Sequence, residues 1–225
     1  MQKIAVIVAG GTGQRMGATI PKQFLLLNGK PLLHHTLQRF LETWTDLEII
    51  LVLPEEHIKA GNEIIMDLQA TERVKITRGG DSRFQSVKNG LLLVKEPAVV
   101  FVHDGVRCLV SHDLIKRCYQ QTLNKGSAIP AVAATDSIRI VNGQQHQVID
   151  RNQVRIIQTP QTFLSELLLP AFDRPFEEKF TDEATVVEAS GKEVYLIEGE
   201  FTNIKITRPA DLIIAEQVIA SQGIL

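Results

Sequence analysis

Continuous runs of β-branched and other apolar residues recur along the first half of the chain, and they constrain its fold more than any other feature. The clearest runs lie at 4–9, 48–53 and 98–103, with a weaker one at 73–76. Such continuous runs are typical of parallel strands that are buried on both faces. Segments with the apolar spacing of amphipathic helices separate them, at 31–41, 55–70, 83–95 and 111–124. This alternation predicts an α/β fold with a mostly parallel sheet and helices on both faces.

The pattern changes after Ala133, where two extended stretches flank Asn142-Gly143, a strong signal for the turn of a β-hairpin. Both stretches are polar and rich in glutamine, so the hairpin has little apolar surface to bury against its own domain. We therefore expect a protruding β-hairpin arm near 136–155. Beyond it the pattern predicts strands at 155–157, 194–197 and 203–206, and helices near 163–173, from 181 and from about 208. With no linker and no internal repeat, residues 1–225 are expected to form a single domain.

Composition and charge argue against several classes of protein. The 225 residues are 44% hydrophobic, too apolar for a disordered chain, and their net charge of -2 argues against an electrostatically driven nucleic-acid partner. No apolar run approaches the roughly 18 residues of a membrane span, and the N-terminal segment lacks the features of a secretory signal. Cys108 and Cys118 belong to no CxxC pair or metal-spaced cluster, so we expect reduced thiols and no metal ligands. These features predict a cytoplasmic protein with no membrane partner.

A glycine-rich turn directly after the first predicted strand is the first candidate site. The glycines of segment 9–17 allow backbone N–H groups to point into one concavity, which suits a polyphosphate. The turn lacks the Gly-Lys-Ser/Thr of a Walker loop, and Met16 stands where a dinucleotide fingerprint has its third glycine. Two cations, Arg15 and Lys22, lie just beyond Gly10, Gly11 and Gly13. A plain surface loop is the alternative interpretation.

Two more loops follow predicted strands. In the loop 78–86, Ser86 and the backbone of Gly80 are suited to recognise a base edge, although an ordinary cap and turn would use the same residues. Asp104, after the strand at 98–103, is suited to a magnesium–phosphate complex or a ribose hydroxyl. A surface ion pair of Asp104 with Arg107 is the alternative. Because ligands of open α/β sheets bind at the carboxyl ends of the strands, we expect these loops to face one another.

Further polar residues are scattered through the second half, namely Arg151, Thr159, Thr181 and Lys205. Lys205 alternates with Ile204 and Ile206, so taken alone it would be an exposed lysine of a strand. The residues by themselves therefore predict a nucleotide- or phosphate-binding α/β protein and leave its activity open.

Eight motifs occur in a fixed order: AGGTGQRMG, PKQF, GGDSRFQSV, HDGVR, DRN, QTPQTF, FTDEATVVEASG and NIKITRPADL. Over nearly the whole chain this set closely resembles the 2-C-methyl-D-erythritol 4-phosphate cytidylyltransferase family. The resemblance implies a sheet of nucleotide-diphospho-sugar transferase (Rossmann-like) type and the transfer of CMP from CTP to a polyol phosphate in non-mevalonate isoprenoid biosynthesis. It also implies a homodimer whose β-arms clasp the partner. Magnesium is expected to be bound mainly through CTP phosphates and water.

The resemblance implies roles for individual residues as well. Arg15 and Lys22 would stabilise charge on the α-phosphate of CTP, while Arg151 and Lys205 would position the phosphate of the acceptor. The remaining site residues divide into a set that holds the nucleotide, namely Ala9, Gly10, Gly11, Thr12, Gly13, Gly80, Asp81, Ser86, Asp104 and Gly105, and a set on the acceptor side, namely Arg107, Ser137, Thr159 and Thr181.

Two positions depart from the family pattern: Cys108 replaces a usual proline, and Ser137 replaces a usual threonine. Two alternatives are weighed against this family. Ribitol-5-phosphate cytidylyltransferase shares the glycine turn and the PKQ and TPQ segments, but the Asp-Arg-Asn segment 150–152 looks more like the methylerythritol enzyme. A non-catalytic nucleotide-binding or nicotinamide-dependent protein is the alternative from another class. A nicotinamide site needs an acid where the second strand ends, and Pro54 stands there.

Overall fold

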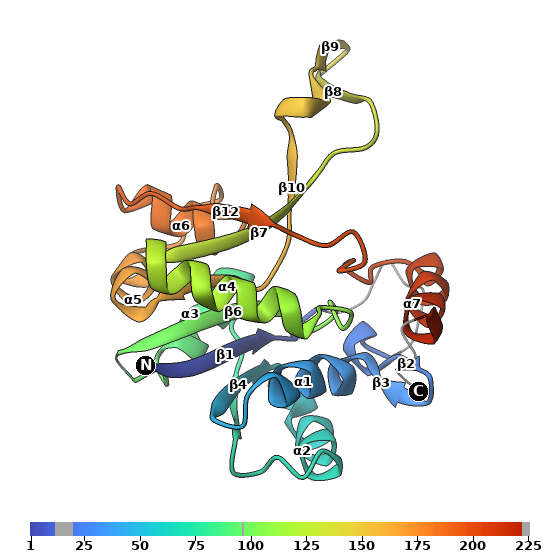
Figure 1. Ribbon diagram of the computed structural model, residues 1–225, viewed down its shortest axis with the longest axis vertical. Coiled ribbons are helices and arrows are strands. Elements are labelled where there is room, and N and C mark those ends of the chain that lie inside the picture. Colours follow the sequence, from blue (N-terminus) through green and yellow to red (C-terminus); the bar gives the residue numbers. More distant parts are fainter. Residues whose placement is uncertain (12–19, 96, 222–225) are drawn as a thin grey trace.

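A computed structural model describes residues 1–11, 20–95 and 97–221. Its central layer is a sheet of strands in the order β10-β7-β11-β6-β1-β4-β5, and β12 pairs with β7 (Figure 1). The bounds of these strands are Gln2–Val8 (β1), Leu47–Leu53 (β4), Val74–Arg78 (β5), Ala98–Asp104 (β6), Ser127–Ala133 (β7), Arg155–Ile157 (β10), Gln161–Leu164 (β11) and Leu196–Glu198 (β12). Short strands β2 (Leu26–Leu27) and β3 (Lys30–Pro31) pair separately. No helix among the described residues is both long and apolar enough to cross a bilayer.

The strands that the apolar runs predict form the parallel half of the sheet. β1 pairs in parallel with β4 on one side and with β6 on the other, and β4 pairs in parallel with β5. Val8 is the register partner of both Val52 and Asp104, so the carboxyl ends of these strands lie at one edge. The loops that follow β1, β5 and β6 therefore start close together. The prediction of a mostly parallel sheet is confirmed.

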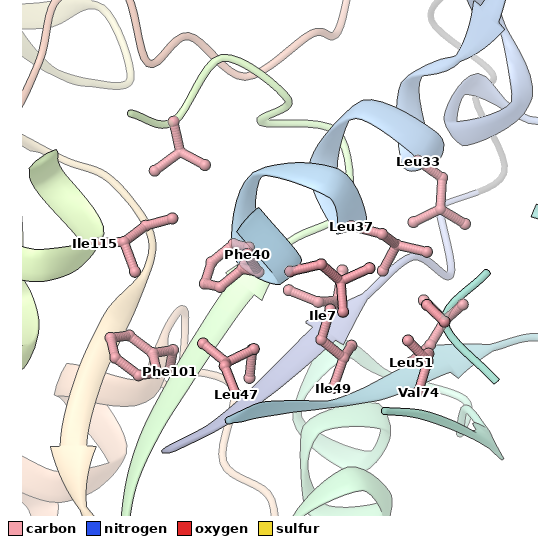
Figure 2. Packing of buried hydrophobic residues seen from close by; sticks show 14 of the residues in the cluster. Ile7, Leu33, Leu37, Phe40, Leu47, Ile49, Leu51, Val74, Phe101 and Ile115 are labelled. Carbon is pink, nitrogen blue, oxygen red and sulfur yellow. The ribbon is translucent and has the colours of Figure 1, made fainter. Parts of the chain in front are cut away.

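The helices cover both faces of this sheet, as predicted, because successive strand residues point to opposite sides. Ile7 and Ile49 contribute to one core, and Val6 and Val100 to the other. Figure 2 shows the first core, in which Phe40 of α1 lies over the strands. Helices with residues in the first core are α1 (Leu32–Thr43), α2 (Ile58–Asp67) and α4 (His112–Lys125). Helices with residues in the second are α3 (Arg83–Leu91), α5 (Ser165–Phe172) and α6 (Glu183–Ala189).

Local chemistry sets both ends of α4. The Ser111 hydroxyl accepts the backbone N–H of Leu114 at 2.9 Å, which satisfies one of the unpaired donors of the first turn. Gly126 adopts a φ of 87° and ends the helix, a conformation that glycine reaches without strain. Cys118 in α4 and Cys108 are free and buried, and burial raises the pKa of each thiol to about 12.

Two features of the second half differ from expectation. Residues 161–164 form β11, which lies antiparallel between β6 and β7, where the sequence predicts only the approach to a helix. The predicted strand at 203–206 is wrong, because this segment is irregular and leads into α7 (Pro209–Ser221). Ile206 donates its N–H to the carbonyl of Val106 at 3.1 Å and is buried in the cluster that contains Cys108. Its apolar character thus reflects docking on the loop after β6.

The segment from Ile138 to Ile149 forms a separate two-stranded sheet that stands away from the rest of the chain (Figure 1). β8 (Ile138–Asn142) and β9 (Gln145–Ile149) are antiparallel and meet at Gly143, whose φ is 59°. Ile140, Val141 and Val148 are exposed on this arm. A single turn of 3-10 helix, Arg151–Gln153, leads back toward the sheet. The role of the arm in dimerisation stays a prediction.

Candidate active site

Two neighbouring hollows lie at the carboxyl edge of the parallel strands. The first, of about 280 Å³, is bordered by the ends of β1 and β6, the loop after β5, Lys22 and Lys205. The second, of about 200 Å³, is bordered by Arg107, by residues around Thr159 and by Thr181. Arg83, Asp104 and Lys205 line both hollows, so they form a wall that the two share.

The glycine turn and Lys22 form one side of the first hollow. The amide of Gln23 is buried and donates to the carbonyl of Ala9 at 2.8 Å, which ties the end of β1 to the turn containing Lys22. A Cβ atom on Gly11 would lie 2.9 Å from Cε of Lys22, so the end of the lysine side chain lies against this glycine. Three predicted residues of this segment, Thr12, Gly13 and Arg15, lie outside the described residues.

The loop after β5 forms the opposite side of the first hollow. Ser86 is buried, and its hydroxyl accepts the N–H of Gly80 at 3.0 Å and lies 3.3 Å from the Gly80 carbonyl. A Cβ at Gly80 would come within 2.2 Å of the Gln85 side chain, so only glycine fits there. Ser82 caps α3 by accepting the N–H of Gln85 at 3.1 Å. Ser86 therefore shapes the backbone of this loop, while Asp81 is exposed at its tip.

Asp104, at the end of β6, is the electrostatic centre of the shared wall. Its carboxylate lies 2.9 Å from Nζ of Lys205 and 3.4 Å from Nε of both Arg83 and Arg107. Burial alone would raise the pKa of Asp104, but the three cations lower it well below the usual range. Asp104 is only 7% exposed, so the pair with Arg107 is not the surface ion pair of the alternative interpretation. The carboxylate stays ionised and gathers three positive groups at one point.

A buried hydrogen-bond network supports the second hollow. The Thr159 hydroxyl accepts the N–H of Asp104 at 3.1 Å and lies 3.0 Å from Nδ1 of His103. The other ring nitrogen of His103 lies 3.1 Å from the carbonyl of Arg107. Burial is the main cause that lowers the pKa of His103, to about 4, so the imidazole is neutral at physiological pH. Arg107 also donates to the carbonyl of Asn203 at 2.9 Å, which links this loop to the segment before Lys205.

Most of the predicted site residues within the described ranges come together at the two hollows. Those that line them are Ala9, Gly10, Gly11, Lys22, Gly80, Asp81, Ser86, Asp104, Arg107, Thr159, Thr181 and Lys205. Gly105 adjoins them and donates its N–H to the Val8 carbonyl at 2.9 Å. Ser137 and Arg151 are exposed at the arm, and the guanidinium of Arg151 donates to the carbonyl of Thr135 at 2.7 Å. Within one subunit, these two are not part of the candidate site.

Sequence reasoning assigned no role to several polar residues that line or support the hollows. These are Gln23, Arg83, Gln158, Gln161, Asp182 and Glu183. Two of them could have been found from the motifs, because Arg83 lies inside GGDSRFQSV and Glu183 lies inside FTDEATVVEASG. The bidentate contact between these two side chains spans 100 positions, so spacing along the chain does not reveal it.

The carboxylates at the first hollow set the kind of metal site that it can provide. Asp81 and Asp104 line it, and Asp104 already faces three cations. Among the described residues, no group of three His, Cys, Asp or Glu side chains is arranged to hold a metal ion. This donor set suits a cation that arrives with a phosphate ligand rather than one held by protein side chains alone.

Comparison with known proteins gives the same family over almost the full length. The family model described as "IspD: 2-C-methyl-D-erythritol 4-phosphate cytidylyltransferase" matches residues 3–221. A protein of Bacteroides fragilis with that enzyme name is 42% identical over 219 residues, which cover 97% of this chain and 100% of the relative. Its namesake in Azobacteroides pseudotrichonymphae is 44% identical over 220 residues, covering 97% of this chain and 99% of the relative.

Solved structures extend the similarity to three dimensions. The enzyme of that name from Thermus thermophilus is 31% identical with a TM-score of 0.77, covering 98% of this chain and 100% of its own. The one from Francisella tularensis is 31% identical with a TM-score of 0.80, covering 96% of this chain and 99% of its own. Sequence and fold thus point to the same group of proteins.

Proposed function

The chain belongs to the 2-C-methyl-D-erythritol 4-phosphate cytidylyltransferase family, and from this premise we propose how its two hollows divide the reaction. The enzyme transfers CMP from CTP to 2-C-methyl-D-erythritol 4-phosphate, giving 4-diphosphocytidyl-2-C-methyl-D-erythritol and pyrophosphate, in isoprenoid precursor biosynthesis. CTP occupies the first hollow and the acceptor the second. The observation that carries this division is the wall of Arg83, Asp104 and Lys205 that both hollows share.

Charge is the main obstacle to this reaction. A phosphate oxygen of the acceptor attacks the α-phosphorus of CTP, and pyrophosphate leaves. Because a phosphate monoester is largely ionised near neutral pH, the nucleophile needs no general base. The site must instead hold two mutually repelling anions in line and neutralise the charge that develops between them.

The cations at the two hollows suit this task. Lys22, and Arg15 by the family resemblance, stabilise the α-phosphate. Lys205, and Arg151 by the same resemblance, position the acceptor phosphate. A lysine 4 Å from a phosphate charge contributes about 4 kcal/mol at an effective dielectric constant of 20. Asp104 keeps Lys205, Arg83 and Arg107 in place before the substrates arrive. This preorganisation lowers the barrier because the charges need not be gathered during the reaction.

We propose that magnesium enters with CTP, held by the nucleotide phosphates and water. Asp81 and Asp104 are the carboxylates that line the first hollow, and Asp104 already pairs with three cations. Once bound, the ion would neutralise part of the charge on the transferring phosphate. We further place the reaction in the cytoplasm, where nucleoside triphosphates are available.

CTP should be preferred over UTP by at least about 100-fold in kcat/KM, because a site that accepts the exocyclic amine of cytosine leaves buried polar groups unpaired against a carbonyl. The backbone of Gly80 and the side chain of Asp81 supply that recognition. Steady-state pyrophosphate release with each nucleotide measures the ratio. Ser86→Ala, which loosens the loop, should reduce the ratio. Ser190→Ala, at the end of α6, should leave it nearly unchanged because Ser190 lines neither hollow. Similar kcat/KM values for CTP and UTP would refute the base-recognition role.

The arm is proposed to join two copies of this chain. Ile140, Val141 and Val148 are exposed on a two-stranded hairpin, and an isolated hairpin is at best marginally stable in water. Packing on a twofold partner stabilises it, since the same contact is then made twice. Arg151 at its base, which lines neither hollow of its own subunit, then serves the site of the partner.

Mixing two inactive variants tests this arrangement. In a heterodimer of Lys22→Ala and Arg151→Ala subunits, one site carries both changes and the other carries neither. Random pairing makes roughly half of the dimers mixed, so about a quarter of wild-type activity should return in the mixture and about half in the purified mixed dimer. The subunits are co-expressed with different tags, and the mixed dimer is purified. A purified heterodimer as inactive as its parents would show that Arg151 acts within its own subunit.

The function itself is tested by incubating the protein with CTP, magnesium and one polyol phosphate at a time while pyrophosphate is followed. Methylerythritol phosphate should support release, and ribitol 5-phosphate should support far less. The opposite preference would assign the chain to the alternative acceptor.

A further inference from the structure

A buried carboxylate beside the site takes no part in the mechanism described above. Glu183, the first residue of α6, has a side chain only 1% exposed. Both of its oxygens meet the guanidinium of Arg83: Oε1 contacts Nη1, and Oε2 accepts from Nη2 at 3.1 Å. Paired contacts of this kind fix the plane of the guanidinium as well as its position.

The other edge of the same guanidinium faces the centre of the site. Nε of Arg83 lies 3.4 Å from Oδ1 of Asp104, so the group is held between two carboxylates that come from different parts of the fold. The side chain of Arg83 remains 31% exposed, and it lines both hollows. Each Nη carries a second N–H, and these are the donors that remain for a ligand in the hollows.

The position of Glu183 is itself rigid. The backbone N–H of Ala184 donates to the amide oxygen of Gln161 at 2.8 Å, which anchors the start of α6 to β11. Asp182 accepts the N–H of Thr185 at 2.9 Å, and the Thr185 hydroxyl contacts the Asp182 N–H at 3.3 Å, forming a capping box. A side chain that starts from such a fixed backbone can aim a long, flexible arginine.

We propose that Glu183 is a positioning residue for the transfer: it holds the guanidinium of Arg83 at the wall between the hollows, where Arg83 donates to the phosphate oxygens of the reacting substrates. Arg83 has several rotatable bonds, and without Glu183 its guanidinium would be held only by the longer contact with Asp104. Arg83 stays charged. Burial lowers the pKa of its guanidinium, but the two carboxylates raise that pKa by more, so it lies above its usual value. Glu183 thus acts on the direction of this cation rather than on its protonation.

A purely structural ion pair is the competing explanation, and a double-mutant cycle in the pyrophosphate assay separates the two. Glu183→Gln keeps the shape of the side chain and removes the charge; we expect kcat to fall about 30-fold and the KM for CTP to change less than threefold. Arg83→Met should lower kcat by a similar factor. In the Arg83→Met background, Glu183→Gln should change kcat by less than threefold, because Glu183 acts through Arg83.

Glu188→Gln is the matched control on the same helix. Glu188 is exposed and lines neither hollow, so the same change of glutamate to glutamine there should leave kcat within twofold of wild type. If Glu183→Gln does not fold, Glu183→Asp keeps the charge on a shorter arm and should lower kcat about fivefold. Folded Glu183→Gln, or Glu183→Asp in its place, with wild-type kcat would overturn the proposal, as would additive losses in the cycle.

The inference rests on the proposed function. The activity of the wild-type protein in the same assay distinguishes a failure of the function from a failure of the role of Glu183. A wild-type protein that releases no pyrophosphate from CTP and methylerythritol phosphate contradicts the function. An active wild type together with an equally active Glu183→Gln contradicts only the role of Glu183.

Discussion

Lys22→Ala should lower kcat by at least about 100-fold, the usual loss when one preorganised charge stabiliser is removed from an active site. Lys22 borders the first hollow and lies across Gly11, beside the backbone that we assign to the CTP phosphates. Its charge matters most when negative charge builds on the transferring phosphate, so the affinity for CTP should change less than kcat. The same loss is expected for Arg15→Ala.

Lys30→Ala is the matched control for this substitution. Lys30 lies eight positions further along the chain and pairs with Asp67 at 2.7 Å on the surface, away from both hollows. Its removal should leave kcat unchanged. A folded Lys22→Ala protein with near-normal kcat would exclude Lys22 from the chemistry and leave the glycine turn as a binding element only.

Asp104→Asn should abolish most of the activity and also destabilise the fold. The substitution keeps the shape of the side chain but leaves Arg83, Arg107 and Lys205 gathered around a neutral group. Breaking a buried ion pair by removing one partner costs about 3–5 kcal/mol, because the remaining charge is no longer compensated. We expect a loss in the free energy of unfolding of that order and a fall in kcat of more than about 100-fold.

The pH dependence of stability gives a second readout of Asp104. Its pKa is lowered in the folded state, so its stabilising contribution is fully present above about pH 4 and is lost as the pH falls through the folded-state value. Asp104→Asn should remove this part of the acid sensitivity, as measured by denaturant unfolding at several pH values. The control Asp113→Asn affects an exposed pair with Arg117 and should change stability by less than about 1 kcal/mol. Unchanged stability and kcat in Asp104→Asn would show that the cations do not depend on this carboxylate.

The parallel half of the fold could be predicted because its strands are buried on both faces and therefore appear as unbroken apolar runs. β11 could not, since its four residues, Gln161–Leu164, are too few to show a period. They become a strand only by pairing with β6 and β7, which are distant in sequence. The error at 203–206 has the opposite cause: alternating isoleucines imitate a strand, although Ile206 is apolar because it docks on the loop after β6.

The candidate site was predictable where topology fixes it. Strand ends of a parallel sheet converge, so Gly11, Gly80 and Asp104 could be placed at one edge from the sequence pattern alone. The partners of these residues could not be predicted in this way. Asp104 meets the distant Lys205, and Glu183 meets Arg83 across 100 positions because helices α3 and α6 pack on the same face of the sheet. Such contacts depend on tertiary packing, which spacing along the chain does not encode.

The central claim is that the acceptor phosphate attacks the α-phosphorus of CTP at the wall shared by the two hollows. The most direct measurement uses methylerythritol phosphate labelled with ¹⁸O in its phosphate group, with the products followed by ³¹P NMR and mass spectrometry. We predict that one unlabelled pyrophosphate is released for each acceptor consumed and that all of the label stays in the diphosphate of the product, including its bridging oxygen. Release of CMP instead of pyrophosphate, or an unlabelled bridging oxygen in the product, would contradict the claim.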